Sequence, residues 1–155
     1  MFTLNCEESA MKKANSSSGF SLAELLVAVA IIAVLVAVSI PLFTNQLEKS
    51  REATDAADAR VYYAEIVASL VSETLNKDNT IIHVGNNLEA TATYEGDVLK
   101  SVTVSGWEAH QKVAKWQIDD LTIAKAQVPK DSNWVGATSI TYVFENDTLE
   151  SITAA

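Results

Sequence analysis

One acidic residue lies at the edge of an apolar stretch that is long enough to cross a lipid bilayer. Glu24 is followed by fourteen consecutive apolar residues, Leu25–Val38, and no Lys, Arg or His occurs between Lys13 and Lys49. A charge near the middle of a span costs roughly 2.5–3.5 kcal/mol on insertion scales and less near its end, so it persists only with a partner or a function. The chain offers no side-chain cation in this layer.

A cut of the backbone after Gly19 would supply the missing cation, because the new α-amine of Phe20 is positive near neutral pH. Phe20 and Glu24 are four residues apart, so on a helix they lie on one face. The amine of one copy could equally meet Glu24 of another. Alternatively, Glu24 only complements the positive end of a helix, where acidic residues are favoured in the first turn.

The apolar stretch continues through Pro41 to Phe43 and so reaches about the twenty residues that a spanning helix needs. A secretory signal peptide is the alternative reading, but Glu24 adjoins the apolar run and the polar residues 15–19 separate the lysines from it. Pro41 has no amide N–H, so it either bends the helix or marks where the membrane span ends. Basic residues flank both ends of the stretch, so their distribution does not predict which end of the span is cytoplasmic.

Length and charge limit what the rest of the chain can do. A chain of 155 residues suits one modest domain, and its formal charge of −9 belongs wholly to residues 20–155, which argues against nucleic-acid binding. Cys6 is the only cysteine, so an intramolecular disulfide is excluded. Met11 offers an economical alternative to Met1 as the start of translation.

A second, amphipathic half of the helix is predicted over residues 45–75, since no helix breaker occurs between Pro41 and Asn76. Its apolar side needs a partner surface. Arg51 and Asp55, four residues apart, are expected to pair on the exposed side. The apolar stripe is Ala56, Ala59, Tyr62, Tyr63, Ile66, Val67, Leu70 and Val71, with Asp58, Glu65, Ser69 and Ser72 opposite.

After Asn76–Asn79 the pattern changes to short strands separated by turns. These features predict an α+β fold in which a long N-terminal α-helix, transmembrane and then amphipathic, packs against a small antiparallel β-sheet. The predicted strands cover residues 80–84, 88–94, 98–104, 138–144 and 148–153, with hairpin turns at 95–97 and 145–147.

Residues 105–133 do not have one clear pattern. Ser105 and Glu108 have the spacing of a capping box, which predicts a helix through about Trp116, but a strand over 113–118 is the alternative. The three tryptophans are expected to fill a core or a subunit contact rather than to line a ligand surface. They are Trp107, Trp116 and Trp134.

The sequence predicts no metal, no cofactor and no enzyme activity. His83 and His110 have no second ligand at a metal spacing and are interpreted as ordinary surface or strand residues. Asp119, Asp120 and Asp131 do not have the regular spacing of ligand residues that a calcium-binding loop has. The chain also has no Gly-rich phosphate loop, no GxSxG elbow and no usable cysteine nucleophile.

The run Gly19-Phe20-Ser21-Leu22-Ala23-Glu24 follows a short basic leader and precedes an apolar helix that contains Pro41. This combination resembles the class III signal of type IV pilins and pseudopilins. The resemblance implies a prepilin peptidase that cuts between Gly19 and Phe20, methylation of the Phe20 amine, docking through Glu24 and a helix kink at Pro41. It also implies a leader at 1–19, a transmembrane and assembly half at 20–44, an amphipathic half at 45–75 and a β-rich domain at 76–155.

The same resemblance implies a function as a prepilin, the structural subunit of a type IV pilus-like filament. Its partners would be other pilin subunits in a homopolymer, with or without minor pilins, the prepilin peptidase/methyltransferase and an inner-membrane assembly platform. The precursor would be a single-pass membrane protein with a cytoplasmic leader, and the mature form a cell-surface or extracellular filament. Two alternatives stay open: a pseudopilin of a type II secretion or competence (DNA-uptake) machine, and a membrane-anchored extracellular binding domain that does not polymerise.

Overall fold

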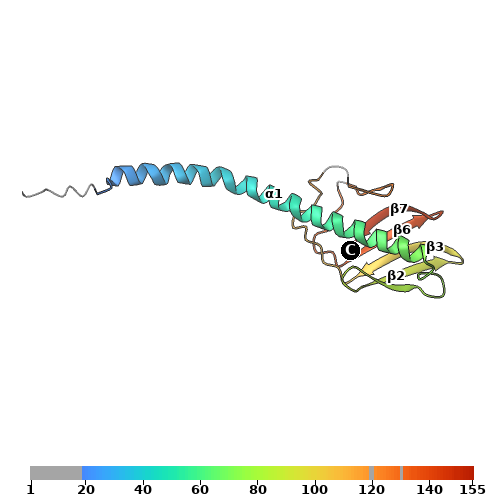
Figure 1. Ribbon diagram of the computed structural model, residues 1–155. Coiled ribbons are helices and arrows are strands. Elements are labelled where there is room, and N and C mark those ends of the chain that lie inside the picture. The colour runs from blue at the N-terminus through green and yellow to red at the C-terminus, as the bar shows by residue number, and fades with distance from the viewer. Residues whose placement is uncertain (1–18, 119–120, 130) are drawn as a thin grey trace, which may run out of the picture. The chain divides into compact units, whose positions relative to one another are not determined.

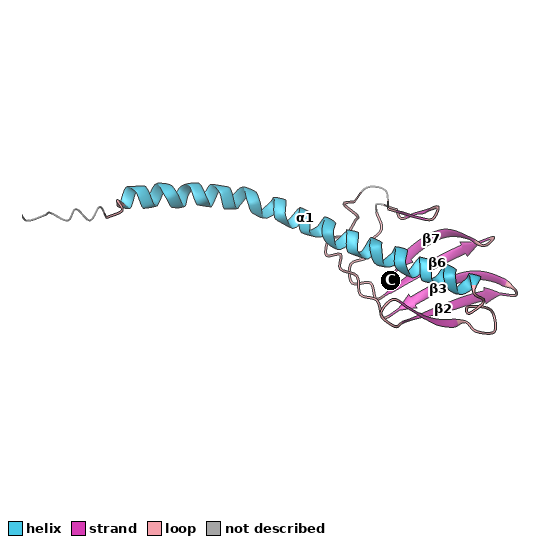
Figure 2. Ribbon diagram, in the orientation of Figure 1, coloured by secondary structure: helices cyan, strands magenta, loops and turns pink. Residues whose placement is uncertain are grey.

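A computed structural model of the chain describes residues 19–118, 121–129 and 131–155. It divides into two units, residues up to Ile40 and Pro41–Ala155, which are described separately. The leader proposed at 1–19, with both candidate start methionines, lies outside the described residues except for Gly19. Figures 1 and 2 show that one helix, α1, is followed by a sheet in the second unit.

Helix α1 covers Leu22–Val71 and ends four residues earlier than the sequence predicts. Glu73 has a φ of +57°, and the amides of Thr74 and Leu75 both donate to the carbonyl oxygen of Ser69, at 2.9 and 3.1 Å. Such a left-handed turn satisfies the last free carbonyl groups of a helix. It also brings Leu75 into the core, where it is buried.

The sheet of the second unit has five antiparallel strands in the order β1-β2-β3-β6-β7. Each strand lies within one residue of its predicted position, so the predicted α+β fold is confirmed. A separate two-stranded ribbon, β4 and β5, was not predicted. The strands are β1 (Ile81–Val84), β2 (Leu88–Glu95), β3 (Val98–Ser105), β4 (Thr122–Ile123), β5 (Ala126–Gln127), β6 (Ser139–Glu145) and β7 (Thr148–Ala154).

Two tight turns close the hairpins β2–β3 and β6–β7. In the second turn Asn146 and Asp147 both have positive φ, +49° and +59°, as a type I′ turn requires. Each hairpin has a register shift close to its turn, between Thr93 and Tyr94 in β2 and between Val143 and Phe144 in β6. Such irregularities re-aim side chains near a strand end.

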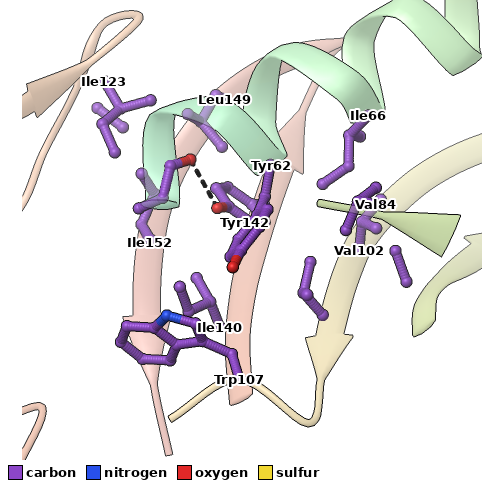
Figure 3. Close-up of a cluster of buried hydrophobic side chains, with 14 of the residues drawn as sticks. Tyr62, Ile66, Val84, Val102, Trp107, Ile123, Ile140, Tyr142, Leu149 and Ile152 are labelled. Carbon is purple, nitrogen blue, oxygen red and sulfur yellow. Dashed lines mark hydrogen bonds between the residues drawn. The ribbon is translucent and has the colours of Figure 1, made fainter. Parts of the chain in front are cut away.

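The core lies between the second half of α1 and one face of the sheet, as Figure 3 shows. Ala56, Ala59 and Ile66 of the predicted stripe are buried, and the small side chain of Ala59 leaves its carbonyl oxygen accessible from the sheet. The hydroxyl of Tyr142 in β6 donates to that oxygen at 2.7 Å (Figure 3). Burial, with Tyr62 and Asp58 nearby, raises the pKa of Tyr142, so its hydroxyl stays neutral and donates.

The stripe departs from the prediction at its edges. Val71 is exposed, while Asp58 and Glu65, expected on the opposite side, contact the rest of the second unit. Asp58 accepts from the indole Nε1 of Trp107 at 3.1 Å, and Glu65 accepts from the amide of Gly85 at 2.6 Å. The acidic residues thus satisfy donors at the border of the core.

Both predictions for the segment after β3 are wrong, because residues 106–118 form neither a helix nor a strand. Trp107 and Trp116 are buried in this irregular segment, and each meets Trp134 edge to face, with ring centroids 5.8 and 4.8 Å apart. The interpretation of the tryptophans as core residues is therefore confirmed. The segment's backbone amides are bonded by carboxylates of α1, described below, which replaces the pairing that a helix or strand would provide.

Candidate processing and assembly site

The start of α1 is built as a capping box around the run that begins at Gly19. Ser21 is the N-cap residue: its hydroxyl accepts from the amide of Ala23 at 3.3 Å, and its carbonyl from the amide of Leu25 at 3.1 Å. Glu24 reaches back and accepts from the amide of Ser21 at 2.9 Å. In the uncut chain Glu24 therefore stabilises the helix terminus, directly beside the peptide bond that follows Gly19.

Phe20 precedes the helix rather than lying in its first turn. The helix begins at Leu22, so the expectation that Phe20 and Glu24 share a helical face does not describe the uncut chain. The capping box still turns the Glu24 carboxylate toward the N-terminal side, since its partner is the amide of the residue after Phe20. Both Phe20 and Glu24 are exposed.

The apolar part of α1 leaves its large side chains exposed. The large side chains from Leu25 to Ile40 remain between about half and two-thirds exposed, for example Leu26 at 67% and Val38 at 67%. By length and composition this helix can cross a membrane, and none of its most apolar window is buried. The surface is therefore available for lipid or for another protein.

Pro41 lies inside α1, which continues on both sides of it. The continuous helix that the sequence predicts across Pro41 is therefore confirmed. Its ring nitrogen cannot donate to the carbonyl oxygen of Ala37, which weakens the helix there. The boundary between the two described units falls between Ile40 and Pro41. A kink at this position stays a prediction.

Three carboxylates that the sequence analysis missed form a row on α1 in the second unit: Glu48, Glu52 and Asp55. All three are buried, at 2%, 0% and 0% exposure. Their spacing of four and three residues places them on one face of the helix. This carboxylate row continues the face on which Ala59 and Tyr62 are buried.

The carboxylate row binds the backbone of the irregular segment after β3. Six amides donate to it, so each buried charge is satisfied by charge-assisted hydrogen bonds. Glu48 accepts from Lys112 and Val113 at 2.6 and 2.7 Å, Glu52 from Gln117 and Ile118 at 2.8 Å each, and Asp55 from His110 and Gln111 at 2.8 and 2.9 Å.

The predicted ion pair between Arg51 and Asp55 is wrong for the same reason. Asp55 faces the segment after β3, and the guanidinium of Arg51 instead donates to Glu48 at 3.1 Å. Burial by itself would raise the pKa of Glu48, but the amides of Val113 and Lys112 and the Arg51 guanidinium together lower it below its ordinary value of 4.5. Glu48 is therefore ionised at neutral pH and fixes the segment.

His110 and His83 are both exposed, as the sequence predicts, but His110 also contacts a buried carboxylate. Its Nδ1 lies 2.8 Å from Asp55, and its ring is half-exposed. Asp55, Asp58 and His110 bring one ligand atom each within 4.8 Å of one another. Hydrogen bonds account for all three, since Asp55 holds the segment's amides and Asp58 the Trp107 indole. Asp119 and Asp120 lie outside the described residues, and Asp131 is exposed.

Comparisons with known proteins identify the N-terminal run. A family described as the prokaryotic N-terminal methylation motif matches residues 14–40. The comparison with curated proteins found no match, and neither did the comparison with solved structures. The matched residues include Gly19, Phe20 and Glu24, and the α+β layout of the second unit fits a pilin.

The motif and the apolar helix fit a membrane-anchored precursor. In general such a motif implies processing by a prepilin peptidase and assembly with other pilin subunits, and it points to structural rather than enzymatic proteins. The chain carries the class III signal of type IV pilins and pseudopilins, the N-terminal motif of a pilin-like precursor.

Proposed function

We propose that the chain is the precursor of a structural subunit of a type IV pilus-like filament. A peptidase cuts it between Gly19 and Phe20 and methylates the new amine, and the subunit polymerises through its N-terminal helix. The observation that carries the proposal is the position of Glu24, the only ionisable side chain between Phe20 and Leu47, within hydrogen-bond distance of the amide of Ser21.

The cut changes the electrostatics of this end of the helix. Before it, Glu24 accepts from a neutral amide, that of Ser21, at 2.9 Å. After it, an ammonium group lies one residue before Ser21, and a carboxylate in an apolar layer gains most from such a full positive charge. The Phe20 amine of an incoming subunit can pair with Glu24 of a neighbour, or the incoming Glu24 with the neighbour's amine. In either case the two opposite charges neutralise each other within the apolar layer.

The exposed apolar surface supplies the second part of the assembly. While the subunit is stored, lipid covers the side chains of residues 25–40. Outside the bilayer that surface is stable only against other subunits, because exposure of each large apolar side chain costs about 1.5–3 kcal/mol. Growth of the filament therefore transfers the helix from lipid to equivalent helices.

The decisive variant is Glu24→Ala in the full-length chain. We expect N-terminal processing at a level close to that of the parent and a strong loss of sheared filaments. Mass spectrometry of the subunit measures processing, and electron microscopy of sheared surface material measures assembly. Gly19→Leu is the complementary variant, because a bulky side chain at the cut position should leave the leader attached.

Each variant has an outcome that contradicts its part of the proposal. Normal filaments from Glu24→Ala would show that Glu24 has no docking role. A Gly19→Leu subunit with the mass of the mature parent would show that the cut does not depend on Gly19. Antibody against residues 76–155 tests the filament itself in the parent strain. If the antibody labels only membranes, the chain is a membrane-anchored domain and not a filament subunit.

A further inference from the structure

We propose that the basic loop Lys112–Lys115 of one subunit docks into an acidic-rimmed apolar groove at the end of α1 in a second copy. The inference rests on the proposed filament and specifies one contact between its globular parts. Four properties of the second unit lead to it: a groove, its charge, a pre-shaped loop of opposite charge, and the distance that separates the two.

The groove has a volume of about 410 Å³ and lies where the last turns of α1 meet the two hairpin ends. The register shifts in β2 and β6 occur beside the residues that these strands contribute to it. Its rim carries two carboxylates, one from each hairpin turn, Asp97 and Asp147. Apolar and aromatic side chains form its walls, among them Val67, Leu70, Tyr94 and Phe144.

The two rim carboxylates are not equivalent. Asp97 is 2.6 Å from the ammonium of Lys77, and both side chains are exposed. Asp147 has no ion pair among the described residues. The groove therefore presents one uncompensated negative charge beside an apolar wall, and it favours a segment that combines a cation with a small apolar side chain.

The loop Lys112-Val113-Ala114-Lys115 has that combination. All four residues are exposed, with Val113 at 47%, on a chain that has only 11 basic residues against 20 acidic ones. Glu48 holds the amides of Lys112 and Val113, so the loop is fixed before any partner arrives. A pre-shaped loop loses little conformational entropy on binding.

The positions of loop and groove decide how two copies can meet. Glu48, which holds the loop, precedes Val67 of the groove by nineteen residues of α1, or about 28 Å along the helix axis. One subunit cannot bring its own loop to its own groove. When all copies point the same way, as in the proposed filament, the contact is heterologous: each subunit gives its loop to one neighbour and its groove to another, and such contacts continue into filaments unless they close into a ring.

Disulfide cross-linking in assembled filaments tests the contact. Cys6, the only cysteine, lies before the proposed cut, so a mature subunit has no thiol of its own. We expect the full-length chain with Val113→Cys and Asp147→Cys to give a ladder of cross-linked multimers after oxidation of sheared filaments. The matched control combines Val113→Cys with Thr93→Cys, since Thr93 is exposed while its neighbour Ala92 faces the core, and it should give no ladder.

Charge reversal gives a second measurement that does not depend on the cysteines. Lys112→Glu combined with Lys115→Glu should lower the yield of filaments roughly tenfold at equal subunit level, a loss of about 1.4 kcal/mol per contact. Asp147→Lys added to this chain should restore a large part of the yield, because the opposite charges meet again.

Filaments without a ladder, or without rescue by Asp147→Lys, would overturn the docking contact and leave the proposed function intact. Absence of filaments from the unmodified parent would overturn the proposed function instead.

Discussion

At the scale of single residues, Gly85 shows how closely the turn after β1 fits α1. Its φ is +53°, a region that side chains rarely adopt, and a Cβ added there would lie 2.5 Å from Cε1 of Tyr62. Its amide donates to Glu65 at 2.6 Å. The positive φ and the close contact with Tyr62 together explain why the residue at this turn is glycine.

Gly85→Ala should therefore destabilise the second unit by about 2–4 kcal/mol, which combines the cost of positive φ with overpacking against the Tyr62 ring. Gly96→Ala is the matched control, because Gly96 also has a positive φ of +63° but nothing lies within 4 Å of its added Cβ. That control should lose only about 1 kcal/mol. Urea unfolding followed by tryptophan fluorescence measures both, and equal losses would contradict the contact.

At the scale of elements, the carboxylate row joins α1 to the segment after β3. At its start the segment 106–118 bonds the chain just before β6, since the amides of Gly106 and Ala109 donate to the carbonyl oxygens of Thr138 and Ala137. From residue 110 onward, the six amides bonded by Glu48, Glu52 and Asp55 position it. A buried amide left without a partner costs about 1–3 kcal/mol. The carboxylates of the row thus provide the hydrogen-bond acceptors that a helix or a strand would otherwise provide.

Because of this arrangement, the free energy of unfolding should decrease as the pH falls. The pKa of Glu48 is lower in the folded chain than its ordinary value of 4.5, so its contribution is fully present above that value and is lost as pH falls through the lower, folded pKa. Glu48→Gln removes this titration and places an amide donor against backbone donors. We expect a loss of about 2–3 kcal/mol at pH 7 and a smaller difference from the parent near pH 3.

Urea midpoints of the parent and of Glu48→Gln at the two pH values provide the measurement. Lys49→Gln serves as the control for a change of charge on the same helix, because Lys49 is exposed. A difference between parent and Glu48→Gln that stays constant with pH would show that the carboxylate does not titrate in linkage with folding.

The sequence predicts those elements whose structure is specified by residues close to each other in the chain. Hairpins closed by Gly96 and by Asn146-Asp147 are specified within a few residues, and they were predicted within one residue. The segment 106–118 depends on acceptors more than fifty residues away, so no local pattern could reveal it. The row did leave one signal, three acidic residues at helical spacing in line with Ala59, on the side that is expected to be apolar.

At the scale of the whole molecule, the proposed assembly and the folding depend on different residues. Glu24 accepts from the amide of Ser21, within five residues of the proposed cut, and the large side chains from residue 25 to 40 are exposed. Among the described residues, the hydrophobic core begins at Ala56, and the buried carboxylates begin at Glu48. The class III signal could be recognised from local sequence alone, since it lies within one continuous run of residues, 14–40.

This separation predicts opposite responses from two variants of the full-length chain. Glu24→Ala should keep the urea midpoint of the parent and lose filaments, because it removes a docking charge but no core contact. Gly85→Ala should lower the midpoint and keep N-terminal processing, because the cut position lies far from Gly85 in the chain. Its filament yield should fall only as far as the folded fraction falls, and should recover at lower temperature. A midpoint lowered by more than about 1 kcal/mol in Glu24→Ala would mean that the assembly end also stabilises the fold.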